Sequence, residues 1–209
     1  MEITSINSLS IPDVKIIRFS RFTDNRGYFS EIYNKNDFSP CCDFLKNIEF
    51  KQVNESFSFA NTFRGLHIQW DPAMGKMLRL VRGHLIDFAL DLRIDSLTYK
   101  KIISYEVKNS NNYCDWIWIP PGFAHGVLLL DDSIIEYFCT ETYNAKGEQS
   151  ISILSENIDW SLCAPEVKKY FDFENIQKLN MSCRDKNSIF LSEFEVLDQA
   201  ALIKKHNII

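Results

Sequence analysis

Apolar and polar residues alternate along the middle of the chain with the period of two that is typical of β-strands. The clearest case is IDFALDLRI, residues 86–94, where Ile86 and Phe88 lie on one face and Asp87 and Asp91 lie on the other. We therefore expect a series of short strands with unlike faces. The same pattern recurs in residues 76–83, 102–107, 115–122, 126–132 and 134–143.

Turn residues separate these stretches. All seven glycines lie between residues 27 and 147, and the last 62 residues contain none. Glycine gathers where a chain turns sharply, and the sequence Pro120–Pro121–Gly122 cannot continue a central strand. Many short strands with regular turn signals predict a mainly β fold, either a sandwich or a barrel.

The C-terminal part of the chain follows a different pattern. The segment 165–179 begins with a proline, and its apolar residues have roughly helical spacing, which predicts a helix. The segment 191–205 is a second predicted helix. We expect a β-barrel core over residues 11–160 and a helical region over residues 161–209, within a single domain that spans residues 1–209.

Composition narrows the classes of partner. Hydrophobic residues make up 45% of the chain and aromatic residues 13%, which is a globular composition. The net charge of -5 and the lack of a long lysine or arginine run argue against nucleic-acid binding. We expect no membrane segment, because no apolar run approaches the length of a span. We also expect no signal peptide, because the N-terminus lacks a basic region followed by an apolar one.

The cysteines suggest a reducing compartment. No two of them form a C-x-x-C pair, and two are adjacent, which suits neither an ordinary disulfide nor a zinc site. Reduced thiols in a cytoplasmic protein are the simplest interpretation. The cysteines are Cys41, Cys42, Cys114, Cys139, Cys163 and Cys183.

Candidate chemistry centres on two histidines. In FRGLHIQW, residues 63–70, His67 and Gln69 fall on the strand face opposite Leu66. A polar strand face in an apolar protein is either exposed to solvent or lines a cavity. His125, in PPGFAHG, follows a rigid turn and precedes an apolar strand. A lone histidine at either position is more often structural or exposed than catalytic.

Several cations stand next to glycines. Arg26, Arg64 and Arg82 each precede one, which lets the backbone and the guanidinium approach an anion together. The alternative is a turn beside a solvated charge, and we prefer that interpretation for Arg82. Lys76 follows another glycine at a strand start, and it is either solvated or directed into the same cavity as His67.

A metal centre would need more ligands than the sequence offers. Metal-binding β-barrels with histidine ligands usually carry His-x-His followed by a glutamate, whereas the element here is H-I-Q. His67 and His125 alone make a poor ligand set, so we expect no metal site. The remaining histidines, His84 and His206, are expected at the surface.

In combination, these motifs resemble the dTDP-4-dehydrorhamnose 3,5-epimerase family over residues from about 11 to about 160. The resemblance implies a cupin-type jelly-roll β-barrel and a homodimer that acts on a small nucleotide-linked sugar without metal or cofactor. The matching stretches follow the order and nearly the spacing of the family: DNRGYFSEIYN (24–34), KQVNES (51–56), FRGLHIQ (63–69), MGKMLRLVRGHLIDFALDLR (74–93), SLTYKK (96–101), WIPPGFAHG (118–126), EYFCTETYNAKGEQSI (136–151) and IDW (158–160).

The resemblance implies isomerase chemistry that suits these residue types. A 4-keto sugar has acidic C–H bonds at C3 and C5, and epimerisation needs a base, an acid on the opposite face and a group that stabilises the enolate. By motif position, His67 is the base, Tyr137 is the acid and Lys76 stabilises the enolate. Asp185, in MSCRDK, is the expected partner that orients His67.

The resemblance also implies a set of substrate contacts. Arg26 and Arg64 are expected to meet the diphosphate through charge-assisted hydrogen bonds. In this family the segment that carries Arg26 reaches towards the neighbouring subunit's site. The other expected contacts to the base, sugar or phosphates are Glu31, Gln52, Asn54, His125, Tyr143, Glu148 and Arg184.

The sequence is also compatible with other activities. Related enzymes epimerise only C3 or only C5, or act as 3,4-ketoisomerases, on similar substrates. Val127 stands where the family usually has an aromatic residue, and a smaller residue beside the sugar could change which carbons react. A non-catalytic sugar-nucleotide-binding protein would need no base and acid on opposed faces. A metal-dependent oxygenase would need a metal.

Overall fold

The computed structural model describes residues 2–37 and 42–204, so Cys41, His206 and the last residue of the predicted helix 191–205 lie outside the described residues. The described strands form two large sheets and one small hairpin. The six-stranded sheet has the order β1 (Ile3–Ser8), β2 (Lys15–Ser20), β10 (Tyr113–Ile119), β7 (Lys76–Arg82), β12 (Ser133–Cys139) and β5 (Gln52–Ser58). The five-stranded sheet has the order β13 (Glu148–Ser150), β6 (Thr62–Gln69), β11 (Phe123–Leu129), β8 (His84–Asp91) and β9 (Ile102–Lys108).

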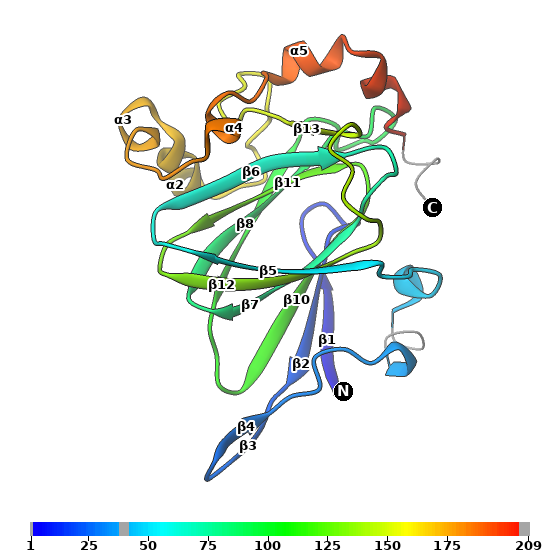
Figure 1. Cartoon of the computed structure of the whole chain (residues 1–209), viewed down its shortest axis with the longest axis vertical. Coiled ribbons are helices and arrows are strands. Elements are labelled where there is room, and N and C mark those ends of the chain that lie inside the picture. The colour runs from blue at the N-terminus through cyan, green and yellow to red at the C-terminus, as the bar shows by residue number, and fades with distance from the viewer. Residues whose placement is uncertain (1, 38–41, 205–209) are drawn as a thin grey trace.

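The two sheets face each other across the centre of the molecule (Figure 1). Neighbouring strands in both sheets pair in antiparallel fashion. Apolar side chains from both sheets pack between them, including Leu78 and Ile117 from one and Ala89 and Leu129 from the other. The fold is a jelly-roll β-barrel with short C-terminal helices, which confirms the predicted fold class.

The outer face of the five-stranded sheet is covered by the C-terminal segment. There, Phe88 packs edge-on against Phe171 with 5.4 Å between the ring centroids, and Phe194 joins the same cluster. The alternation predicted for residues 86–94 is present in β8, but both of its faces are buried. Asp87 is only 3% exposed, because the polar face of β8 turns into the barrel and not to solvent.

The outer face of the six-stranded sheet is covered only in part. Tyr33 and Phe50 pack against Phe138 of β12, and the Trp116 ring of β10 lies tilted against the same phenyl ring, with 5.0 Å between the centroids. The 3-10 helix η1 (Asp43–Leu45) lies in this covering segment. Further along the sheet, the outward side chains of β5 remain exposed.

The C-terminal region is helical only in short pieces. The segment 165–179 contains α2 (Pro165–Lys168), η2 (Lys169–Phe171) and α3 (Phe173–Ile176), so the prediction of one continuous helix was wrong. Asp172 interrupts it, because its backbone is extended and its side chain accepts a hydrogen bond from the amide of Asn175, which caps a new helix. The remaining pieces are α4 (Cys183–Lys186), α5 (Leu191–Glu195) and η3 (Asp198–Leu202).

Within residues 2–37 and 42–204, no helix has the length and apolar character needed to cross a membrane.

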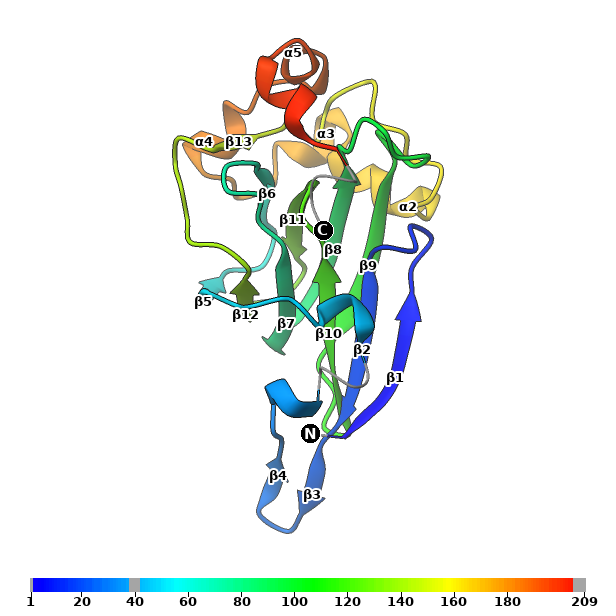
Figure 2. The same ribbon diagram turned by 90° about the vertical axis from the view of Figure 1, so that its right-hand side faces the viewer.

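A hairpin of β3 (Phe22–Asp24) and β4 (Gly27–Phe29) projects from the body of the molecule (Figures 1 and 2). Arg21 anchors its base, since the buried guanidinium stacks on the Tyr28 ring at 4.2 Å and donates to the carbonyl of Ser110. The hairpin therefore has a defined direction relative to the barrel.

Two glycines let β6 and β11 approach closely beside the interior histidines. Gly65 has a φ of +139°, and a Cβ built on it would lie 2.5 Å from the Cα of Gly126. The pairing of β6 with β11 shifts register between His125 and Val127. This arrangement sets His125 directly opposite His67 across the two strands.

We expect Gly65→Ala to be much more destabilising than Gly27→Ala. Gly27 also has a positive φ, +131°, but nothing lies within 4 Å of a Cβ built there. Gly27→Ala therefore costs only backbone strain of about 1–3 kcal/mol. Gly65→Ala adds overpacking of about 1–3 kcal/mol. Urea unfolding of both variants measures the difference, and equal losses would contradict the close approach of the two strands.

Candidate active site

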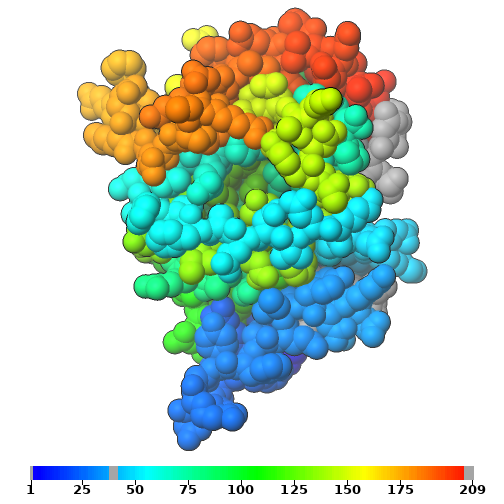
Figure 3. Space-filling model, viewed as in Figure 1, coloured from blue at the N-terminus to red at the C-terminus, as the bar shows by residue number. Residues whose placement is uncertain are grey.

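A pocket of about 210 Å³ opens between the two sheets, and we call it the central pocket. In Figure 3 it is the hollow between β5 and the C-terminal segments. Its apolar lining comes from Leu78, Val127 and Ile135. Its polar lining comes from Ser56, Arg64, His67, Lys76, His125, Tyr137, Ser182, Arg184 and Asp185. The fold thus brings together all four residues that the resemblance assigned to catalysis.

His67 of β6 is hydrogen-bonded to Asp185 of α4, with 2.6 Å between Nε2 and Oδ1. Ser182 caps the same helix, and its hydroxyl donates to the other carboxylate oxygen of Asp185 at 2.7 Å. Burial alone would raise the pKa of Asp185, but the hydrogen bond and charge of His67, with help from Ser182, hold it below its usual range. The ionised carboxylate accepts from Nε2–H, which leaves Nδ1 of a neutral imidazole free to accept a proton.

A second histidine–carboxylate pair lies beside the first. His125 Nε2 is 2.8 Å from Oδ2 of Asp87, and both side chains are buried. His125 lies within β11 and not ahead of it, since the strand begins at Phe123. Sequence reasoning missed Asp87 as a site residue, although its place on the polar face of residues 86–94 was the signal that could have found it.

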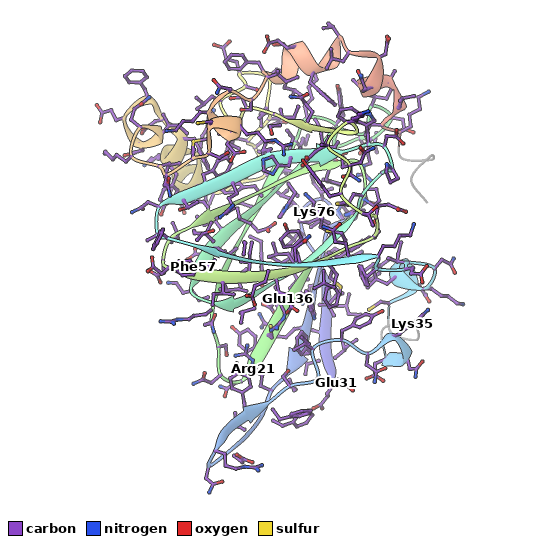
Figure 4. The ribbon with its side chains drawn as sticks, viewed as in Figure 1. Arg21, Glu31, Lys35, Phe57, Lys76 and Glu136 are labelled. Carbon is purple, nitrogen blue, oxygen red and sulfur yellow. The ribbon has the colours of Figure 1, made fainter. Side chains whose placement is uncertain are left out.

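Lys76 and Tyr137 occupy the opposite wall, on β7 and β12 of the six-stranded sheet. Figure 4 shows the Lys76 side chain in the space between the two sheets. Burial lowers the pKa of Lys76, although Cys139, Glu148 and Asp87 oppose this shift. No residue in the described ranges forms an ion pair with its ammonium, so the cation is free to meet a ligand anion.

Tyr137 keeps its proton at neutral pH. Burial raises the pKa of its phenol, and the neighbouring Cys139 and Glu148 raise it further, while Arg64 opposes them. His67 and Tyr137 therefore present a proton acceptor and a proton donor from opposite sheets of the barrel.

Arg184 separates the central pocket from a second hollow of about 520 Å³, which we call the side pocket. Its guanidinium pairs with Glu148 at 2.7 Å, donates to the Ser150 hydroxyl at 2.9 Å and lies 3.4 Å from the Tyr143 hydroxyl. Tyr143 and Glu148 line the side pocket with Arg184. These three predicted substrate contacts thus form one connected group.

Gln52 and Asn54 are joined to the loop that carries Tyr143. The Gln52 side chain donates to Oδ1 of Asn54 at 3.0 Å and accepts from the backbone amide of Tyr143 at 2.9 Å. The buried Gln69, which was not predicted as a site residue, holds the same loop by donating to the carbonyl of Thr142 and accepting from the amide of Asn144.

Two of the predicted substrate contacts lie at or just after the hairpin, outside the central pocket. Arg26 sits at the hairpin, where it pairs with Asp24 at 2.6 Å and is largely exposed. Glu31 follows the hairpin and accepts a hydrogen bond from Asn34, well away from Lys76 in Figure 4. Neither residue lines the central pocket of its own chain.

His84 is less exposed than predicted. Its ring is 15% exposed and pairs with Glu106 at 2.6 Å, outside the central pocket. Among the residues that the structure describes, no group of three or more His, Cys, Asp or Glu side chains is arranged to hold a metal ion.

A jelly-roll barrel whose inner walls set a histidine–carboxylate pair opposite a lysine and a tyrosine has the architecture of a cupin-type epimerase, one class of isomerase. Residues 8–193 match the family model for dTDP-4-dehydrorhamnose 3,5-epimerase. The chain therefore belongs to the dTDP-4-dehydrorhamnose 3,5-epimerase family, as the sequence motifs predicted.

Curated relatives and solved structures agree with this assignment. The dTDP-4-dehydrorhamnose 3,5-epimerase of Sinorhizobium fredii is 42% identical over 147 residues, which cover 69% of this chain and 73% of the relative. That of Methanothermobacter thermautotrophicus is 35% identical over 179 residues, covering 85% and 89%. The structure of dTDP-6-deoxy-D-glucose-3,5-epimerase from Legionella pneumophila in complex with dTDP-4-keto-L-rhamnose has a TM-score of 0.78 and 28% identity, and the match covers 96% of this chain and 97% of that one.

We expect Asp185→Asn to lower the free energy of unfolding by about 1.5–3 kcal/mol at neutral pH, because a charge-assisted hydrogen bond is lost. The folded-state pKa of Asp185 is lowered, so its carboxylate stabilises the fold above the unfolded pKa of about 4. This contribution disappears as the pH falls through the folded pKa. Urea unfolding from about pH 6 to about pH 3 should show the gap to wild type shrinking. A constant gap would contradict the assignment.

Proposed function

We propose that this protein epimerises a nucleotide-linked 4-keto-6-deoxyhexose at C3 and C5, converting dTDP-4-dehydro-6-deoxyglucose to dTDP-4-dehydrorhamnose. The observation that carries the proposal is the opposition of the His67–Asp185 pair to Lys76 and Tyr137 across one pocket. Family membership and the sugar nucleotide bound in the Legionella pneumophila structure support this substrate class.

His67 is the base in this proposal. Asp185 holds the imidazole by Nε2 and stabilises the imidazolium that forms when Nδ1 takes a proton from carbon. The C–H bonds at C3 and C5 are acidic because both carbons neighbour the C4 ketone. Removal of either proton yields an enolate, whose negative charge lies on the C4 oxygen.

Lys76 meets that charge. Its ammonium lies at the pocket wall without a carboxylate partner among the described residues, so an enolate oxygen would be its counter-ion. In a site that excludes water, such a preplaced cation stabilises developing charge more strongly than it would in solvent.

Tyr137 returns a proton from the other face. Its raised phenol pKa keeps it protonated, and its strand belongs to the sheet opposite His67. Delivery of a proton to the face opposite the one that lost it inverts the carbon. The base and the acid must therefore approach from opposed walls, which a two-sheet barrel provides.

The remaining predicted contacts divide between sugar and nucleotide. We propose that His125, oriented by Asp87, contacts the sugar, and that Arg64 and Arg184 meet the phosphates. Tyr143 and Glu148, together with Gln52 and Asn54, would then hold the nucleoside near the side pocket.

We further propose a homodimer in which each chain works as a single catalytic domain. Val53, Phe57 and Phe59 are each more than half exposed on and beside the edge strand β5, a large apolar surface for a lone chain. The projecting hairpin carries Arg26 away from its own pocket, which fits a role at the partner's site. The free thiols of Cys114, Cys139, Cys163 and Cys183 are consistent with a cytoplasmic location.

Hydrogen exchange at carbon tests the activity. In deuterated water, we expect the wild type to exchange the protons at C3 and C5 of dTDP-4-keto-6-deoxyglucose, as followed by NMR. His67→Asn should slow exchange at both carbons by about a hundredfold or more, because general-base catalysis is lost. Tyr137→Phe should impair inversion more than exchange, because it removes the acid and leaves the base.

His84→Asn is the matched control, since it removes a histidine that pairs with a carboxylate outside the pocket. It should leave exchange at the wild-type rate. Exchange at one carbon alone would identify a mono-epimerase, and no exchange by the wild type would overturn the proposal. Intact exchange in His67→Asn would exclude His67 as the base.

Sedimentation analysis tests the dimer. We expect the wild type to sediment at twice the chain mass of 24.4 kDa. Phe57→Asp should shift the protein towards the monomer, because it places a charge in an apolar contact. Leu97→Asp, at a fully exposed site in the loop between β8 and β9, should leave the dimer intact. A monomeric wild type, or equal behaviour of the two variants, would refute this interface.

A further inference from the structure

Ser56 has a buried hydroxyl for which the described residues provide no hydrogen-bond partner. It lies on the interior face of β5, opposite Ile135 of β12, and its side chain lines the central pocket. Asn54, two residues away on the same face, is opposite Tyr137. Ser56 therefore stands on the wall that carries the proposed acid.

Two other serines differ from Ser56 in this respect: Ser58 on the same strand and Ser182 at the pocket wall. The Ser58 hydroxyl accepts from Arg64 at 2.9 Å, and the Ser182 hydroxyl is bonded to Asp185 at 2.7 Å. A buried polar group without a partner costs free energy, and native proteins keep few of them. An unpaired hydroxyl at a pocket wall is therefore poised for a polar group of the ligand.

We propose that Ser56 is a sugar-recognition residue, whose hydroxyl exchanges a hydrogen bond with a free hydroxyl of the bound hexose. The inference rests on the proposed function and names a specificity determinant within it. The chemistry of the sugar limits which of its hydroxyls Ser56 can contact. In a 4-keto-6-deoxyhexose linked through C1, C4 is a ketone, the C5 oxygen closes the ring and C6 carries no oxygen. Only the hydroxyls at C2 and C3 remain.

A neutral hydroxyl also suits a sugar better than the other parts of the ligand. The diphosphate is matched by the guanidinium groups of Arg64 and Arg184, which line the same pocket. The ketone is matched by Lys76. A serine hydroxyl both donates and accepts, as a sugar hydroxyl does. Ser56 thus selects the hexose without taking part in proton transfer.

The test compares Ser56→Ala with Ser133→Ala. Ser133 is also buried in the six-stranded sheet, but its hydroxyl donates to the carbonyl of Asp131 at 2.7 Å and lies outside the pocket. Ser133→Ala should lower the melting temperature and leave kcat/KM at the wild-type value. Ser56→Ala should keep or raise the melting temperature, because it deletes an unpaired polar group, while kcat/KM falls about three- to tenfold.

Calorimetric binding to each protein separates the sugar from the nucleotide. Ser56→Ala should bind the unreactive ligand dTDP-6-deoxyglucose about three- to tenfold more weakly than wild type, with unchanged affinity for dTDP. The wild type should bind one of two analogues, the 2-deoxy or the 3-deoxy form of that ligand, more weakly than the ligand itself. Ser56→Ala should bind that analogue and the ligand with equal affinity.

Unchanged affinity for the sugar nucleotide in Ser56→Ala would overturn the proposal, and so would an equal loss of affinity for dTDP. A lower melting temperature with unchanged kcat/KM would mean that Ser56 is only structural. The binding outcomes need no turnover, so they are independent of the exchange experiment on the wild type that decides the proposed function.

Discussion

The hydrogen bond between His67 and Asp185 joins two parts of the chain that lie 118 residues apart. One part is a strand of the barrel wall, and the other is a four-residue helix in the C-terminal segment. That helix is too short to be stable alone, so its position depends on packing of the C-terminal segment over the five-stranded sheet. The site thus depends on a covering layer that itself contributes little regular structure.

The opposed sheets impose the chemistry of the pocket. Histidines and their carboxylates come from the five-stranded side, while the lysine, the tyrosine and the unpaired serine come from the six-stranded side. Burial disfavours the charged form of any group, so it lowers the pKa of a base and raises the pKa of an acid. It lowers the pKa of Lys76 and raises that of Tyr137, whereas Asp185 stays ionised because His67 and Ser182 outweigh its burial.

Strand periodicity predicted the structure correctly, whereas helical periodicity did not. Period-two alternation identified the six central strands β7 to β12, because side chains on a strand must point to opposite faces. It could not tell which face meets solvent, and β8 proved to be buried on both. The helical spacing of residues 165–179 was misleading, since Asp172 caps a new helix by a local side-chain bond that periodicity does not register.

The sequence by itself determined the central strands, their turns, the family and the residue types of the proposed chemistry, because these follow from local pattern and from motifs that are continuous along the chain. Only the tertiary structure decided which residues meet. Asp87 meets His125 across the pairing of β8 with β11, Gln69 holds the loop that carries Tyr143, and the hairpin places Arg26 away from its own pocket. Such pairings join distant segments, so their geometry exists only once the two sheets and their covering layers have packed.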